Sequence, residues 1–168
     1  MNKAMKNIKA INFLIIGILF LLTSNIFAQN AVSFTEGLAK GKSENKPILI
    51  NVYIAGDSWC AKMESVLSNE KIKSLLPNFV FVKLNAGSDD KFTYNGKQYS
   101  AGELSKYFGA TGYPAFTFLN PDGSIIVYKY NGQDYNSFSG YLDVQDFEKL
   151  LNFFINHNYK DTDLSKVM

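Results

Sequence analysis

The feature that most restricts the fold is a short apolar segment, Ile48 to Ala55, in the first half of this 168-residue chain. It is rich in β-branched residues, and Asn51 is its one strongly polar position. A nearly continuous apolar run of this length is typical of a strand that is buried on both faces. A helical pattern begins close behind it, near Ser58, so we expect strands and helices to alternate along the chain.

The rest of the sequence extends this alternation. A strand–helix–strand crossover followed by an antiparallel pair predicts an α/β fold, with a mixed central sheet and helices on both faces. We expect a polar, aromatic insertion at 131–139 and a C-terminal tail, Asn158–Met168, that buries little. The expected elements are helices over Ser33–Gly41, from Ser58 towards Leu75–Leu76, over Ser100–Phe108 and from Asp143, strands over Ile48–Ala55, Phe79–Leu84, Ala115–Leu119 and Ser124–Tyr130, and a hairpin turn at Asn95–Lys97.

The N-terminal segment has the order of a secretory signal. Three basic residues, Lys3, Lys6 and Lys9, precede the apolar run Ile11–Leu22. Polar Thr23–Asn25 and then Ile26–Ala28, which ends in a small residue, follow it. We expect a signal peptide at 1–28, cleaved after Ala28, and an exported protein, periplasmic or secreted. Its removal would lower the net charge from +2 to −1. An uncleaved membrane anchor is the second interpretation, because the run is short for a span of about 20 residues. After cleavage we expect no stable membrane span.

Composition argues against two classes of partner. All 17 basic residues are Lys and none is Arg, so the bidentate base contacts typical of a nucleic-acid binder are disfavoured. Cys60 and His157 are the single Cys and the single His. The chain therefore cannot form an internal disulfide, and a Cys/His metal site is disfavoured. We expect no cofactor.

Three segments carry a resemblance to a known family. Lys46–Ala55 followed by Asp57-Ser58-Trp59-Cys60-Ala61-Lys62-Met63-Glu64 resembles the first long strand and active-site helix of exported thioredoxin-related proteins, which read Cys-x-x-Cys-Lys-Lys-Met-Glu here. Gly112–Gly123 is similar to their cis-proline segment and following hairpin, and Gly140-Tyr141-Leu142 also matches. The resemblance covers roughly Phe34 to Tyr159 and implies one thioredoxin-fold domain over 29–168, with a short C-terminal tail.

The departures from this family change the expected chemistry. Asp57 stands where the family has its nucleophilic first Cys, and Cys60 stands at the second, resolving position. Asn51 stands where thioredoxins carry a buried acid that moves the proton of the resolving Cys. In an alternative register Trp59-Cys60 is the family's Trp-Cys pair and Met63 takes the second position, but that register needs an insertion in the strand.

Dithiol exchange needs a low-pKa thiolate that attacks and a second thiol that releases the mixed disulfide. Asp57 cannot attack a disulfide, and we expect it to cap the helix by accepting from the amide of Trp59 or Cys60. The helix N-terminus lowers the pKa of Cys60, whereas burial and a nearby carboxylate raise it. Cys60 is thus either a small buried apolar residue or a single redox thiol.

The remaining candidate residues concern binding. Trp59 either contacts a partner or packs against the neighbouring loop. The resemblance implies a cis bond at Tyr113–Pro114 and a loop whose backbone binds an extended peptide by strand addition. Two functions follow: a redox-degenerate, chaperone-like module that binds an exported protein or peptide at Tyr113–Pro114, or a monothiol oxidoreductase with Cys60 as its catalytic residue.

Overall fold

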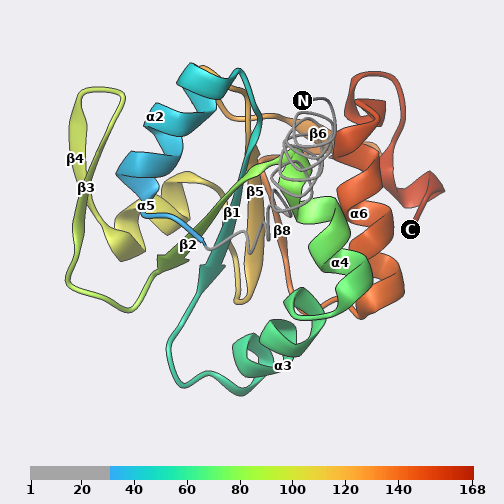
Figure 1. Ribbon diagram of the computed structural model, residues 1–168, viewed down its shortest axis with the longest axis horizontal. Coiled ribbons are helices and arrows are strands. Elements are labelled where there is room, and N and C mark those ends of the chain that lie inside the picture. The colour runs from blue at the N-terminus through green and yellow to red at the C-terminus, as the bar shows by residue number, and fades with distance from the viewer. Residues whose placement is uncertain (1–30) are drawn as a thin grey trace, which may run out of the picture.

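The computed structural model describes residues 31–168, so the expected signal peptide and its alternative as an anchor lie outside the described residues. Within the described part of the chain, no helix is both long enough and apolar enough to span a bilayer. Figure 1 shows a twisted sheet with helices on both of its sides.

The sheet has four strands in the order β2-β1-β5-β8. β1 (Ile48–Tyr53) runs parallel to β2 (Val80–Asn85) and antiparallel to β5 (Ala115–Leu119). β5 is antiparallel to the edge strand β8 (Ser137–Ser139). Every β1 residue before Tyr53 is buried, as expected for a central strand that is covered on both faces. The predicted mixed α/β sheet is confirmed.

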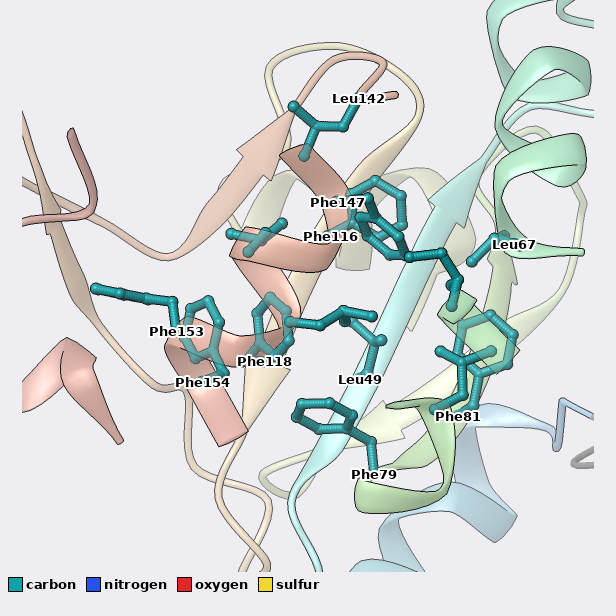
Figure 2. Packing of buried hydrophobic residues seen from close by; sticks show 14 of the residues in the cluster. Leu49, Leu67, Phe79, Phe81, Phe116, Phe118, Leu142, Phe147, Phe153 and Phe154 are labelled. Atoms are coloured by element: carbon teal, nitrogen blue, oxygen red, sulfur yellow. The ribbon is translucent and has the colours of Figure 1, made fainter. Parts of the chain in front are cut away.

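Two apolar clusters lie on opposite faces of the sheet, because alternate side chains of a strand point in opposite directions. Leu49 belongs to one cluster and Ile48 and Ile50 to the other. In the first cluster, drawn in Figure 2, the Phe118 ring of β5 stacks on Phe154 at 3.5 Å between ring centroids. The helices are α2 (Phe34–Glu44) and α5 (Ala101–Tyr107) on one face, and α3 (Ser58–Leu67), α4 (Glu70–Leu75) and α6 (Val144–Ile155) on the other.

Two helices differ from their predicted extents. α2 continues past Gly41, and this glycine is needed for close packing on β1, since an added Cβ would lie 2.7 Å from the Ile48 side chain. It ends instead at Asn45, which is left-handed with φ 49°. The single helix expected from Ser58 is divided into α3 and α4, because Asn69 is extended and accepts from the amide of Lys71 as a new N-cap. A short 3-10 helix, η1 (Leu76–Asn78), follows α4.

The predicted strand Ser124–Tyr130 is only partly correct. One isolated bridge joins Ile125 to Leu119, and the segment then leaves the central sheet. Its last residues form β6 (Tyr128–Tyr130), which pairs with β7 (Gln133–Tyr135) in a separate hairpin. Positive φ angles at Asn131 (51°) and Gly132 (77°) make the tight turn. The insertion at 131–139 therefore supplies β7 and also β8, the edge of the central sheet.

The other predicted hairpin is confirmed. β3 (Lys91–Tyr94) pairs with β4 (Lys97–Ser100), and Asn95 and Gly96 take positive φ angles of 50° and 75° in the turn. This hairpin lies on the side of α2 in Figure 1. The Tyr94 hydroxyl donates a 2.7 Å hydrogen bond to the carbonyl of Gly123, which fixes the hairpin to the rest of the domain.

The expectation that the C-terminal tail buries little is wrong. The tail forms two 3-10 helices, η2 (Asn158–Lys160) and η3 (Leu164–Lys166), and the Leu164 side chain is completely buried. The Asp163 carboxylate accepts from the amides of Asn131 (3.0 Å) and Gly132 (2.7 Å), so it joins the tail to the β6–β7 turn. Sequence pattern missed this because a single leucine among polar residues carries no periodic signal.

Candidate functional site

Asp57 and Cys60 meet at the first turn of α3. Asp57 has extended backbone angles and is the N-cap, and its Oδ1 accepts from the Cys60 amide at 2.8 Å. This hydrogen bond lowers the pKa of the Asp57 carboxyl. The carboxylate thus occupies the exposed start of the helix and satisfies one of the amides that have no partner within it. It stabilises the helix but supplies no nucleophile for a disulfide.

The Cys60 thiol is poorly suited to attack. The residue is only 5% exposed. Burial raises the pKa of the thiol, the backbone of Ile54 partly opposes that shift, and the Asp57 carboxylate raises the pKa further. Burial, the largest of these causes, and the Asp57 carboxylate favour the neutral thiol over the thiolate, which is the reactive form.

A surface pocket of about 250 Å³ lies beside Cys60, between the end of β1 and α3. Lys83 and Glu64, which both line it, form an ion pair of 2.6 Å. The Lys83 ammonium also lies over the Tyr53 ring, 5.0 Å from its centroid. Because this ammonium already has a carboxylate partner, the pocket gives access towards the thiol without offering a free cation to stabilise a thiolate.

Asn51 is 1% exposed on β1. It shares the strand face of Leu49, which packs with Met63 in the cluster beneath α3. Its Oδ1 is buried without a hydrogen-bond partner among the described residues, and no hydrogen bond joins Asn51 to Cys60 there. An amide at this place cannot exchange a proton with a thiol at neutral pH.

The Tyr113–Pro114 loop lies just before β5, and its peptide bond is cis. The Pro114 carbonyl accepts from the Gly140 amide at 2.8 Å, and the Tyr113 hydroxyl lies 3.0 Å from that of Ser105. The backbone N–H and C=O of Tyr113 make no hydrogen bond to any residue in 31–168. Tyr113 lies in a bend outside β5, so these two groups are unpaired backbone groups beside the end of a strand, and strand addition uses groups of this kind.

Trp59 lies on the exposed side of the same helical turn as Cys60. It is 52% exposed, and its ring centroid lies 5.6 Å from that of Tyr141. The Lys62 ammonium lies over both rings, 4.6 Å from the Trp59 centroid and 5.4 Å from that of Tyr141. We call Trp59, Lys62 and Tyr141 the aromatic–lysine surface.

This surface lies next to the Tyr113–Pro114 loop. The Gly140 amide donates a hydrogen bond to the Pro114 carbonyl, and Gly140 directly precedes Tyr141. Sequence reasoning singled out Trp59 and named Lys62 and Tyr141 only as parts of matching segments, without bringing the three together. The spacing of Trp59 and Lys62 places both on one helix face, which is a usable signal. The contact with Tyr141 depends on tertiary folding and leaves no local pattern. The described residues contain no group of three or more His, Cys, Asp or Glu side chains placed to hold a metal ion.

The comparisons with known proteins agree with this geometry. The thioredoxin-like family matches residues 29–121, which is more than half of the chain. A thioredoxin-fold protein from Helicobacter pylori has a similar structure, at 20% identity over 73% of this chain and 80% of its own, with a TM-score of 0.55. A thioredoxin from Thermus thermophilus matches at 19% identity over 74% of this chain and 85% of its own, with a TM-score of 0.53. No curated protein matches the sequence. This chain, which has a single cysteine, belongs to the thioredoxin-like family.

Proposed function

We propose that the protein is an exported, redox-degenerate binding module that holds an extended peptide, or an extended segment of a partner protein, at the Tyr113–Pro114 loop. The observation that carries the proposal is the Asp57 cap. A carboxylate occupies the start of α3 and bonds to the Cys60 amide, so the helix presents an acid where dithiol exchange would need a nucleophilic sulfur.

The thiol side of the site supports this proposal. Cys60 is buried, the pKa of its thiol is raised, and no second cysteine exists in the chain to release a mixed disulfide. Asn51 adds to this, since its amide offers no acid to take up the proton of the thiol. Each part that a turnover cycle would use is therefore either absent or replaced.

The register in which Asp57 replaces the first Cys is also supported. The first Cys of such a pair needs an exposed place at the helix N-terminus, where its pKa falls. Asp57 has a partly exposed place there, whereas Cys60 lies inside the first turn and is buried. In the alternative register Met63 would be the resolving position, and its side chain is fully buried in the cluster beneath α3.

The proposal that this loop binds an extended peptide is supported by the unpaired backbone N–H and C=O of Tyr113. Strand addition uses main-chain hydrogen bonds, so it needs no cysteine. Export rests on the sequence of the N-terminal segment, with its Lys residues, apolar run and small residues before Gln29. The module would then meet unfolded or extended segments of other exported proteins, which is a chaperone-like role.

The test compares two peptides with the same side chains. One is a terminally capped, extended peptide, and the other carries N-methyl groups on alternate backbone amides. Binding is followed by the fluorescence anisotropy of a label on the peptide. We expect the first peptide to bind and the N-methylated one to lose most of its affinity, because it cannot donate to the Tyr113 carbonyl. Equal binding by both peptides would contradict recognition through the backbone.

The second candidate function, a monothiol oxidoreductase, is favoured by the pocket beside Cys60, which gives a small thiol a route towards the sulfur. In that case Cys60 would attack a substrate disulfide, and an external thiol would reduce the resulting mixed disulfide. Partners of an oxidoreductase should be released from the purified protein by reductant. Partners of a binding module should be released by competing peptide and retained in the presence of reductant.

A further inference from the structure

We propose that the aromatic–lysine surface selects, among extended segments, those that carry an acidic side chain. The inference rests on the proposed function, because it assumes a segment held at the Tyr113–Pro114 loop. It adds the chemical class of the bound segment, which the backbone contact alone does not determine.

The first step is position. The Pro114 carbonyl accepts a hydrogen bond from the Gly140 amide, and Tyr141, the residue after Gly140, lies against Trp59. A segment that pairs with Tyr113 would therefore have its adjoining residues beside the exposed indole. Because side chains alternate along an extended chain, one of them would face this surface.

The second step is charge. Lys62 is exposed, and no ion pair in residues 31–168 includes it. Its ammonium lies over two aromatic rings and keeps its N–H donors available. An ammonium held against apolar ring faces is less fully hydrated than one on a free lysine, so a carboxylate beside it interacts more strongly.

The third step concerns the acidic groups nearby, which could cancel this charge. The Asp57 carboxylate accepts from the Cys60 amide, and Glu64 pairs with Lys83. Asp143, two residues after Tyr141, caps α6 by accepting from the Asp146 amide at 2.9 Å. Each of these carboxylates already has a donor of its own. None of these three carboxylates forms an ion pair with Lys62, so its ammonium has no ionic partner within the described chain.

The experiment uses three terminally capped peptides that differ at one position, which is Glu, Gln or Lys. Capping removes the terminal charges, so the variable side chain is the difference. Trp59 is the only tryptophan, so its intrinsic fluorescence reports on this surface directly, and the anisotropy of a labelled peptide gives the affinity. We expect the Glu peptide to bind roughly two- to fivefold tighter than the Gln peptide, and the Lys peptide to bind most weakly. Added salt should reduce this preference.

Two variants complete the test. Lys62→Gln should bring the Glu peptide to the affinity of the Gln peptide. The matched control, Lys42→Gln, changes the net charge equally on α2, on the other face of the sheet, and should leave the preference intact. Equal affinity for all three peptides, or a preference that survives Lys62→Gln, would overturn the inference while leaving the proposed function in place. Binding of none of the peptides would overturn the proposed function, and the inference with it.

Discussion

The first turn of α3 carries two neighbouring regions with opposite properties. Cys60 points inwards, is buried, and has its amide engaged by Asp57. Trp59 points outwards, is half exposed, and lies against Tyr141 and Lys62. Consecutive residues of a helix point in directions roughly 100° apart, so a single turn can present both regions. Under the proposed function, thiol chemistry and peptide recognition would depend on different side chains of this turn and could be lost separately.

The two regions also differ in whether their charged and polar groups have partners within the protein. Around Cys60 the charged groups are paired, as Asp57 is with an amide and Glu64 is with Lys83. At the binding side, the Tyr113 backbone and the Lys62 ammonium lack such partners in the described part of the chain. Unsatisfied polar groups at a surface are the ones that a ligand can use.

The largest effect is expected from restoring the missing sulfur. Asp57→Cys should create a thiol at the helix N-terminus, where its pKa is lowered, and within reach of Cys60. We expect the purified variant to oxidise to an intramolecular disulfide and to gain measurable reduction of insulin, an activity that the native chain should lack. Thiol titration before and after mild oxidation, with an insulin turnover assay, measures both properties.

Ser58→Cys is the matched control for that variant. It adds a thiol in the same turn at a spacing that points away from Cys60, so it should not form the internal disulfide. Two free thiols in a folded Asp57→Cys protein under mild oxidant would show that Asp57 is not the family's first Cys position. Met63→Cys would then be the variant to examine.

The next effect concerns the reactivity of Cys60. Its thiol pKa is raised, so at neutral pH the folded state holds the proton more tightly than the unfolded chain does. We expect alkylation at neutral pH to be about a hundredfold slower in the folded protein than in denaturant, because burial also limits access. The rate should rise with pH, with a midpoint above the ordinary thiol value. A fast rate in the native protein at neutral pH would instead support the monothiol enzyme.

A smaller effect is expected at Asn51, where a thioredoxin-like acid can be restored. Burial should raise the pKa of the carboxyl in Asn51→Asp, so the unfolded chain loses its proton first as the pH rises above about 4. The free energy of unfolding should then fall with rising pH, to about 1–3 kcal/mol below that of the native protein near neutrality. Denaturant titrations at acidic and neutral pH measure this difference.

Asn51→Leu is its control. The Oδ1 of Asn51 has no partner among the described residues, so replacing the amide by an apolar group of similar size should change the free energy of unfolding by less than about 1.5 kcal/mol. If Asn51→Asp were as stable as the native protein at neutral pH, a cation such as Lys83, its neighbour in register on β2, would have to compensate the charge.

Much of the fold can be predicted from the sequence, because many of its determinants are local. The caps Ser33, Asp57, Ser100 and Asp143 all lie at the N-termini of helices, and a side chain that bonds to its own helix leaves a signal within a few residues. The apolar run of β1 is likewise a local pattern, so it can be recognised from the sequence alone. The edge strand β8 could not be predicted, since Ser137–Ser139 is polar and short, and only its pairing with β5 makes it a strand.

The residues of the candidate site also divide into those with a local sequence signal and those that only tertiary contacts bring together. Asp57 and Cys60 are close in sequence, so their contact could be expected. Tyr141 is distant from Trp59 in the sequence, and tertiary contacts such as the β5–β8 pairing and the hydrogen bond from the Gly140 amide to the Pro114 carbonyl bring it alongside. Residues that act through tertiary contacts must be found in the structure.

The most direct test of the central claim, that binding is independent of the thiol, is the affinity of Cys60→Ala for the capped Glu peptide. The measurement is the anisotropy titration used for the native protein, in the presence and absence of reductant. We predict that Cys60→Ala binds with the affinity of the native protein in both conditions, whereas Trp59→Ala binds more weakly while remaining folded. Loss of binding in folded Cys60→Ala, or binding by the native protein that disappears with reductant, would contradict the account.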